Sequence, residues 1–335
     1  MNVQHYSDDN GVEETRGCSA PAAAACNDDA TVKDERVRQQ IPHEEEEEAK
    51  NVVEQQLTED ESRDDEILFR QPESTHLGDC PICCLPMSVG RHQYSIMNCC
   101  CKILCVGCSS EDYKLRREHR RDHTCPFCRV QLGETNNSNA KRMAAANDVL
   151  ALQNLGTEHY KKKKYAKALK FLSRAAELGD AESNYYLSLA YRDGNGVEEN
   201  KKKSISHLKQ AAIGGHPSAR FHLGCYECAV NKFDRAVKHF IIAANHGHDY
   251  SIEALKGCYK AKVISKEDFA AALRAHHGAV NEATSPQREF TSRIVRKKER
   301  DKGEVTGSIA SFLEGVITGN IQYDSFSAAT KKLTV

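Results

Sequence analysis

The residues with the clearest chemical signature are cysteines: ten of the fifteen in this 335-residue chain lie between positions 80 and 128. Nine of these ten form three C-x-x-C pairs and one run of three: Cys80–Cys83, Cys105–Cys108, Cys125–Cys128 and Cys99–Cys101; the tenth, Cys84, directly follows Cys83. A two-residue spacing lets a tight turn direct two sulfurs at one ion, and two such pairs complete a tetrahedral thiolate site. The array supplies eight ligands and therefore predicts two structural zinc ions.

Two other kinds of chemistry use cysteines at this spacing. A redox-active C-x-x-C pair or an iron–sulfur cluster does not account for four groups of cysteines at these intervals. Metal-bound thiolates are occupied, so we expect no catalytic side chain among them. A segment of about sixty residues has only a marginal core. Structural zinc binding, which contributes roughly 10–16 kcal/mol, is therefore expected to hold it folded.

The composition limits the classes of protein that can carry this array. Hydrophobic residues make up 39% and charged residues 28% of the chain, which allows two modest domains with disordered tails. The net charge of -1 argues against a surface that binds nucleic acid throughout. No apolar stretch reaches the roughly 18 residues of a membrane helix, and the first residues lack a secretory signal pattern. We therefore expect an intracellular protein, cytoplasmic or nuclear, with no membrane partner.

Changes in composition divide the chain into five parts. Residues 1–75 are poor in apolar residues and rich in acids, so we predict a disordered acidic tail. The zinc-binding part follows at 76–133, and a polar stretch at 134–146 is predicted to be a linker. Helical repeats are expected at 147–278, and the remainder, 279–335, is predicted to be a mostly disordered basic tail.

An internal repeat marks the helical part. The pattern A-A-x-x-G ends at Gly179, Gly215 and Gly247, which are 36 and 32 residues apart. Periods in this range are typical of solenoids with one helical hairpin per repeat. Small residues let paired helices approach closely, and a glycine after the helix is typical of a left-handed stop. The sequence therefore predicts an all-α solenoid behind a small zinc-stabilised α+β domain.

Three other groups with ligand chemistry are expected to be structural or solvated. His119 and His123 lie in a helical-looking stretch rich in Arg and Glu, where surface positions are expected. Cys225 and Cys228 lie inside a repeat helix, where core packing is expected rather than a third metal site. Residues 288–302 hold 7 bases and 3 acids but few aromatics, so we do not expect a nucleic-acid partner.

The cysteine array resembles a RING finger in which cysteine fills the usual histidine position. RING fingers interleave two sites, and the resemblance implies a ligand set for each. The first zinc ion would be held by Cys80, Cys83, Cys105 and Cys108, and the second by Cys125 and Cys128 with two of Cys99, Cys100 and Cys101. Related Cys-Cys-Gly-Lys strings favour Cys99 with Cys100, the set that we predict, with Cys101 in the place of the glycine. The usual one-residue gap in RING fingers gives the alternative set, Cys99 with Cys101. Cys84 has no ligand role and is expected to be a packed thiol.

This resemblance implies a RING-type ubiquitin ligase, which holds a ubiquitin-loaded conjugating enzyme in an attack-ready geometry. Ile82 matches the apolar residue that contacts the conjugating enzyme, and Arg129 matches the arginine that hydrogen-bonds both ubiquitin and enzyme. Many active RING fingers carry a Trp that this chain lacks, and Leu115 or Tyr113 is the candidate substitute. The alternative function is a zinc-stabilised interaction scaffold without ligase activity.

The helical part resembles Sel-one-like repeats, which are relatives of tetratricopeptide repeats. The residues that carry this resemblance are the three A-A-x-x-G sites, the Leu155-Gly156 pair and the loop 193–197. Such solenoids imply a protein partner, here an unknown substrate or adaptor. The order of the two parts resembles that of a set of RING-plus-repeat proteins abundant in diatoms.

Overall fold

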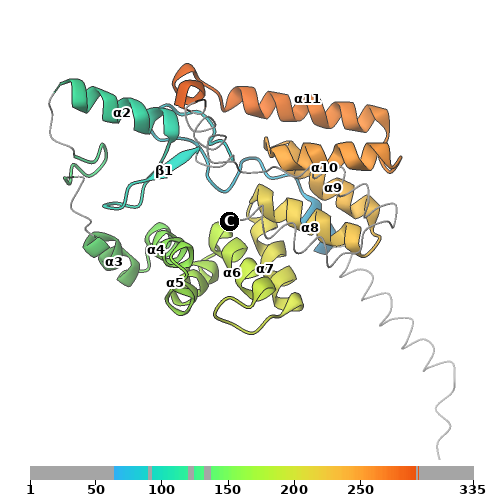
Figure 1. Cartoon of the computed structure of the whole chain (residues 1–335), viewed down its shortest axis with the longest axis horizontal. Coiled ribbons are helices and arrows are strands. Elements are labelled where there is room, and N and C mark those ends of the chain that lie inside the picture. Colours follow the sequence, from blue (N-terminus) through green and yellow to red (C-terminus); the bar gives the residue numbers. More distant parts are fainter. Residues whose placement is uncertain (1–63, 90–92, 120–123, 132–136, 292, 294–335) are drawn as a thin grey trace, which may run out of the picture. The chain divides into compact units, whose positions relative to one another are not determined.

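The computed structural model describes residues 64–89, 93–119, 124–131, 137–291 and 293. All of them belong to one compact unit. A cysteine-rich segment with two strands and one helix comes first, and an array of helices follows (Figure 1). No helix in these ranges is both long and apolar enough to span a membrane.

The cysteine-rich segment is built on one small hairpin. Strands β1 (Tyr94–Ile96) and β2 (Ile103–Cys105) pair antiparallel, and α2 (Val106–Glu118) follows β2 without a break. Its buried apolar side chains are few and include Leu104 and Met87. The hairpin places the run of three cysteines in its loop, and two further cysteines at the junction of β2 with α2.

The helical array consists of hairpins whose two helices pack against each other. Its first helix, α3 (Asn137–Ala145), packs against α4. The hairpins are α4 (Val149–Lys161) with α5 (Tyr165–Glu177), α6 (Ala181–Asp193) with α7 (Lys201–Ile213), α8 (Pro217–Ala229) with α9 (Phe233–Ala244), and α10 (Asp249–Lys260) with α11 (Lys266–Glu282). This arrangement confirms the predicted all-α solenoid.

Side-chain caps begin several helices of the solenoid, and a glycine lies in the turn after the second helix of each of the first three hairpins. The carboxylate of Asp148 accepts a hydrogen bond from the Ala151 N–H at 2.8 Å before α4. Such a cap satisfies one of the otherwise unpaired N–H groups of the first turn. The glycines of the A-A-x-x-G sites have φ values of 88°, 78° and 77°, the left-handed conformation that the sequence predicts.

Two glycines explain why the hairpin helices lie so close. A Cβ atom added to Gly156 in α4 would lie 2.7 Å from Leu172 of α5, and one added to Gly224 in α8 would lie 2.5 Å from Phe240 of α9. Both distances are far below a van der Waals contact. Leu172 and Phe240 are fully buried, so these glycines let the second helix of each hairpin fill the core.

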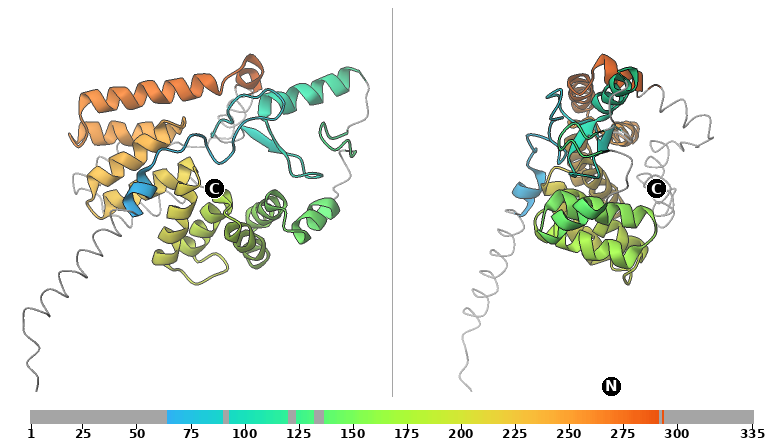
Figure 2. Two further views of the ribbon diagram at one scale, coloured as in Figure 1. Left: turned by 180° about the vertical axis from the view of Figure 1, so that it is seen from behind. Right: turned by 90° about the vertical axis from the view of Figure 1, so that its left-hand side faces the viewer.

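The structure differs from the predicted domain limits at three places. The linker predicted at 134–146 is largely helix α3, because Ala140 and Ala144 pack against α4. Residues 64–75, predicted as tail, include a helical turn at 64–69 and run along α8 and α9 toward β1 (Figure 2). The expected end of the repeats at 278 falls inside α11, and residues 286–291 are also helical. The rest of both predicted tails lies outside the described residues.

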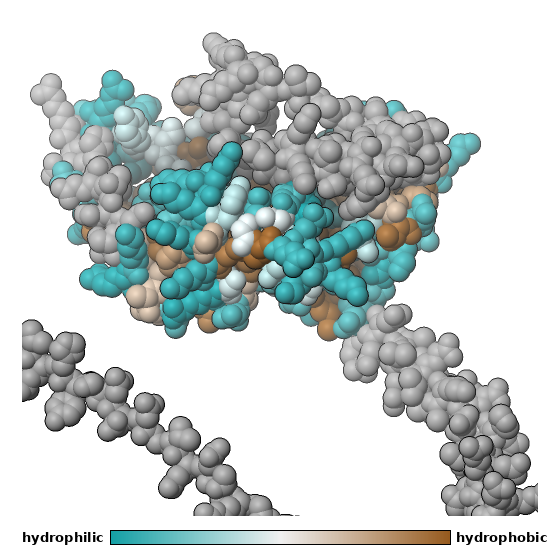
Figure 3. Space-filling view, turned by 60° about the horizontal axis from the view of Figure 1, so that its bottom comes forward, coloured by the Kyte–Doolittle hydropathy of each residue, from teal (hydrophilic) through white to brown (hydrophobic). Residues whose placement is uncertain are grey.

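The surface of the solenoid is mainly hydrophilic on the side that includes the lower helices of Figure 1. Apolar side chains gather there in a narrow strip between polar ones (Figure 3). Lys162–Lys164 lie in the turn between α4 and α5, and they are exposed together with Lys161 at the end of α4. The packing contacts that give the solenoid its core lie between its helices rather than on this face.

Candidate metal centres

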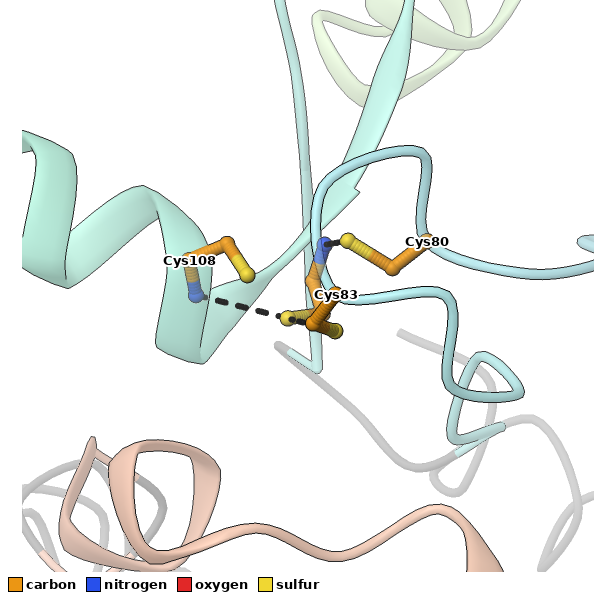
Figure 4. A group of neighbouring side chains, drawn as sticks. Cys80, Cys83 and Cys108 are labelled. Atoms are coloured by element: carbon orange, nitrogen blue, oxygen red, sulfur yellow. Dashed lines mark hydrogen bonds between the residues drawn. The ribbon is translucent and has the colours of Figure 1, made fainter.

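The first cluster brings together four cysteines from two separate C-x-x-C pairs: Cys80, Cys83, Cys105 and Cys108. Cys80 and Cys83 lie on a loop, and Cys108 lies on the first turn of α2, with their side chains facing a common space (Figure 4). The sulfur ligand atoms lie within 4.8 Å of one another. The Sγ atoms of Cys83 and Cys105 are 3.8 Å apart, which equals the separation of about 3.8 Å between sulfurs bound at 2.3 Å around a tetrahedral zinc ion.

The second cluster consists of Cys99, Cys100, Cys125 and Cys128. The Sγ atoms of Cys100 and Cys125 are 3.7 Å apart, and those of Cys99 and Cys128 are 3.4 Å apart. These four ligand atoms also lie within 4.8 Å of one another. Each cluster therefore offers four sulfurs at distances that one tetrahedral ion can bridge.

The chain reaches each cluster through a tight turn that ends in a left-handed residue. The N–H of Cys84 donates to the carbonyl of Cys80 at 2.8 Å, and the N–H of Arg129 donates to the carbonyl of Cys125 at 3.0 Å. Cys84, Arg129 and Cys101 have φ values of 54°, 60° and 56°. This conformation usually belongs to glycine. Each of the three thus closes the turn behind a pair of cluster cysteines.

The position of Cys101 keeps it apart from the cysteines that gather in the second cluster. Its side chain is 1% exposed and packs with Leu152 and Leu155 of α4. Its Sγ accepts a hydrogen bond from Asn154 at 3.9 Å. The structure therefore brings Cys100, and not Cys101, into the second cluster. Cys101 occupies the place of the glycine in a Cys-Cys-Gly string and joins the cysteine-rich segment to the solenoid.

The electrostatics of the clusters fit a bound cation. Burial opposes ionisation of Cys80, but backbone N–H groups directed at its sulfur outweigh burial and lower its pKa to about 6. The same balance lowers the pKa of Cys125. Burial and neighbouring sulfurs raise the pKa of Cys100 to about 11, and raise the pKa values of Cys99 and Cys108. A metal ion supplies the positive charge that allows four crowded sulfurs to ionise together, so the donor sets fit a thiolate-bound metal.

A buried arginine from the far end of the chain contacts the first cluster. Arg288 is 3% exposed, and its guanidinium donates to Cys83 Sγ at 3.1 Å. It also donates to the carbonyls of Leu85 and Pro86, at 3.2 and 2.5 Å. A Cβ atom on Gly107 would lie 2.8 Å from the backbone nitrogen of Arg288, so the close approach of Arg288 needs a glycine at position 107. The arginine sets a positive charge beside a sulfur-rich, negatively charged site.

Arg288 was counted in the basic run at 288–302, and the structure corrects that assignment. Its side chain is buried against the cysteine-rich segment and is not available to a nucleic acid. Residues 294–302 lie outside the described residues. Sequence reasoning missed this residue because its ligand-facing role depends on a contact with a residue 205 positions away.

The remaining sequence-predicted cysteines and histidines lie outside both clusters. Cys84 is exposed, which corrects its prediction as a packed thiol: its turn conformation points the side chain outward. His119 caps the end of α2 and is exposed, as predicted, and His123 lies outside the described residues. Cys225 and Cys228 are buried in the core around Phe240, which confirms their structural role.

A third group of ligand-type residues was not predicted. Nε2 atoms of His76 and His216 lie 3.0 and 3.1 Å from the same carboxylate oxygen of Glu182. Burial would raise the pKa of Glu182, but hydrogen bonds from the two rings hold that pKa well below its usual range. His216 takes the cap position that Asp180 takes one repeat earlier, so the internal repeat was the signal available in the sequence.

The geometry of this third group favours hydrogen bonds over a metal ion. The rings of His76 and His216 are stacked, with centroids 4.2 Å apart and planes 12° apart. The nitrogen lone pairs of two nearly parallel rings do not converge on one ion at about 2.0–2.1 Å, the length of a zinc–histidine bond. Nδ1 of His216 also accepts the N–H of Ala219 at 3.3 Å, which leaves its proton on the nitrogen that faces Glu182. Glu182 therefore clamps two ring N–H groups.

The two residues predicted to contact a conjugating enzyme lie on the surface of the cysteine-rich segment. Ile82 lies between the first two cluster cysteines and is 46% exposed. Arg129 follows Cys128 directly and is exposed. Tyr113 and Leu115 on α2 are exposed as well. Neither Ile82 nor Arg129 belongs to a cluster, so both side chains are available to a partner.

Comparison with protein families and solved structures identifies the helical part. The profile of the Sel1 repeat matches residues 149–180, 181–216 and 217–248, which correspond to the hairpins α4–α5, α6–α7 and α8–α9. The matched residues do not include the cysteine-rich segment. No curated protein matches the sequence.

Two solved structures are similar to this chain. One is a Sel1 repeat protein from Oxalobacter formigenes, with 21% identity over 52% of this chain and 73% of that chain, and a TM-score of 0.39. The other is c5321, a protective antigen of uropathogenic Escherichia coli with an SLR fold, with 17% identity over 60% of this chain and 42% of that chain, and a TM-score of 0.35. The chain spans less than half the length of c5321. The family match shows that the chain carries three consecutive Sel1 repeats at residues 149–248.

Proposed function

We propose that this chain is a RING-type ubiquitin ligase that binds two zinc ions and uses its Sel1 repeats to recruit a substrate or adaptor. The observation that carries the proposal is the interleaving of the two clusters. The first and third cysteine pairs along the chain form one cluster, and the second and fourth pairs form the other. A redox pair needs no such interleaving. Interleaved clusters are the arrangement that the resemblance to a RING finger implies.

The surface of the cysteine-rich segment supports a role in binding a conjugating enzyme. Ile82 and Leu115 are each 46% exposed, and Tyr113 is 59% exposed. These apolar side chains are open to contact with a partner. Arg129 is exposed next to the second cluster, where its planar fork can donate to two partners at once.

The proposed mechanism is positioning. Bound zinc would hold the turns at Cys80–Cys83 and Cys125–Cys128 and thereby fix the positions of Ile82 and Arg129. Ile82 would anchor the conjugating enzyme through apolar contact. Arg129 would donate hydrogen bonds to both the enzyme and its ubiquitin, which restricts the thioester to orientations from which an amine can attack. None of these residues forms a bond with the substrate.

The repeats supply the second half of the proposal. Sel1 repeats are protein-interaction modules, and three of them are present in the chain. The cysteine-rich segment is joined to them by the contact of Cys101 with Asn154 of α4 and by the contact of His76 with Glu182 of α6. A partner bound to the repeats would therefore be held near the conjugating enzyme, which raises the effective concentration of its lysines.

The test is discharge of ubiquitin from a panel of loaded conjugating enzymes by the full-length chain. Hydrogen bonds to charged groups contribute about 1.5–3 kcal/mol, so Arg129→Ala should slow discharge roughly 10- to 100-fold. Ile82→Ala should weaken binding of the conjugating enzyme, and Cys80→Ser should abolish acceleration because it removes a ligand of the first cluster.

Matched controls separate a contact role from a general loss of charge or apolar surface. Arg117→Ala removes another exposed arginine, from α2, and Ile67→Ala removes another exposed isoleucine, from outside the cysteine-rich segment. Both should discharge ubiquitin at the wild-type rate. If no conjugating enzyme is accelerated by a chain that holds two zinc ions, the ligase is rejected and the interaction scaffold stands.

A further inference from the structure

A short segment from before the cysteine-rich part lies across three helices of the solenoid. Residues 64–76 contact α9, α8 and α6 in turn, through side chains and main chain alike. The segment is the blue stretch beside α8 and α9 that continues toward β1 (Figures 1 and 2). It contains one helical turn at 64–69 and is otherwise irregular.

The centre of the contact is a buried arginine that binds main-chain carbonyls. Arg220 of α8 is 1% exposed, and it donates to the carbonyl oxygens of Leu68 and of Arg70, the latter at 3.3 Å. Its Nε atom is buried without a hydrogen-bond partner in the described part of the chain. Burial lowers the pKa of Arg220 to about 10. The main chain of the segment therefore supplies the acceptors that this buried guanidinium needs while the segment covers it.

Apolar and aromatic side chains flank the arginine and pack against two side chains of the segment. Leu68 is 3% exposed and packs with Leu208 and Leu223. The ring of Phe69 lies 4.6 Å from that of His239, and the guanidinium of Arg235 lies over it at 4.9 Å. The neighbouring Ile67 is 51% exposed. The surface therefore contacts the two adjacent apolar side chains of Leu68 and Phe69 and leaves that of Ile67 exposed.

Polar contacts fix both ends of the segment. Asp65 forms an ion pair with Arg235, which also binds Glu227 at 3.0 Å. At the other end, the N–H of His76 donates to the carbonyl of Gly215 at 3.2 Å. A Cβ atom on Gly215 would lie 2.9 Å from the carbonyl oxygen of Ser74, so the segment needs a glycine beneath it.

We infer that this surface of the Sel1 repeats is a peptide-binding groove for the pattern D-x-x-L-F, and that residues 65–69 of the same chain are its resident ligand. A protein partner with such an acidic-apolar peptide gains access to the groove by displacing that segment. The inference deepens the recruiting role proposed above and does not depend on ligase activity. Tethering gives the resident segment an effective concentration of about millimolar, so a weak outside peptide cannot enter the wild-type chain.

The experiment uses the full-length chain and a fluorescent synthetic peptide of residues 64–77. Leu68→Asp places a charge in the apolar pocket and should release the resident segment. We expect the wild-type peptide to bind the Leu68→Asp chain, by fluorescence anisotropy, at least ten times more tightly than it binds the wild-type chain. Adding Arg220→Met to Leu68→Asp should abolish that binding.

Two controls isolate the groove. Ile67→Asp introduces the same charge one residue earlier at an exposed position, and this chain should bind the peptide no better than wild type. A peptide with alanine at the positions of Leu68 and Phe69 should not bind any of the chains. Far-ultraviolet circular dichroism checks that each chain stays helical, and Leu68→Ala replaces Leu68→Asp if that chain unfolds.

The inference is overturned if a helical Leu68→Asp or Leu68→Ala chain binds no peptide. It is also overturned if the wild-type and released chains bind the peptide equally. The readout contains no ubiquitin or conjugating enzyme, so either result leaves the ligase proposal untouched. A failed ubiquitin discharge would likewise leave the groove in place.

Discussion

Chelation of zinc from the intact chain should unfold residues 76–131 and leave the hairpins from α4 to α9 folded. The cysteine-rich segment has few buried apolar side chains, and structural zinc contributes roughly 10–16 kcal/mol to the folding of such segments. The solenoid instead buries side chains such as Leu172 and Phe240 between its helices and holds no cluster cysteine. Loss of metal thus removes most of the stability of one part only.

Hydrogen–deuterium exchange resolves this expectation by segment. Amides of β1, β2 and α2 should exchange fast after chelation, whereas those of α8 and α9 should be unchanged. Zinc added back should restore protection in the first group. Unchanged protection of residues 94–118 in a chain shown by mass to be metal-free would contradict the account.

Arg288→Met should speed release of zinc from the first cluster by about 10- to 100-fold, the range typical of residues that hydrogen-bond to a metal ligand. The guanidinium donates to Cys83 Sγ and to the carbonyls of Leu85 and Pro86. Its loss therefore removes a positive charge and three hydrogen bonds from the turn that carries Cys83. Release into a chromophoric chelator gives the rate. A Cys125→Ser chain, which should keep only the first ion, identifies the phase that belongs to that cluster.

Arg293 provides the matched control. Its side chain is 74% exposed and pairs with Glu289 within its own helix. Arg293→Met should therefore release zinc at the wild-type rate. An equal acceleration in both variants would mean that general charge, rather than the contact with Cys83, governs release.

Much of the solenoid was predictable from local sequence because its signals repeat. Each A-A-x-x-G site places a glycine where the chain needs a left-handed turn, and the Leu-Gly pairs place a glycine where the second helix approaches. Each of these effects acts within one hairpin. Spacing alone could therefore predict helix order and the positions of the turns.

The composition of the clusters was predictable to within one residue. The C-x-x-C spacing marked six cysteines as ligands, and the resemblance to a RING finger implied which pairs share an ion. The preference for Cys100 over Cys101 also came from the resemblance, because spacing does not show which thiol packs against Leu152 and Asn154 of α4. That packing involves a part of the chain some fifty residues away.

Contacts between remote segments were the part that sequence reasoning missed. Residues 64–75 read as an acidic tail because their apolar content is low, yet Leu68 and Phe69 dock against the solenoid. Arg288 read as one base in a charged run. In both cases the partner lies 150 residues or more away along the chain, and no local pattern reports it.

The measurement that tests the central claim most directly is native mass spectrometry of the full-length chain and two variants. The account predicts two zinc ions in the wild type, one in Cys100→Ser and two in Cys101→Ser, since Cys100 belongs to the second cluster and Cys101 packs against α4. A wild-type chain with no metal, one ion or iron would contradict it, as would the loss of an ion from Cys101→Ser but not from Cys100→Ser.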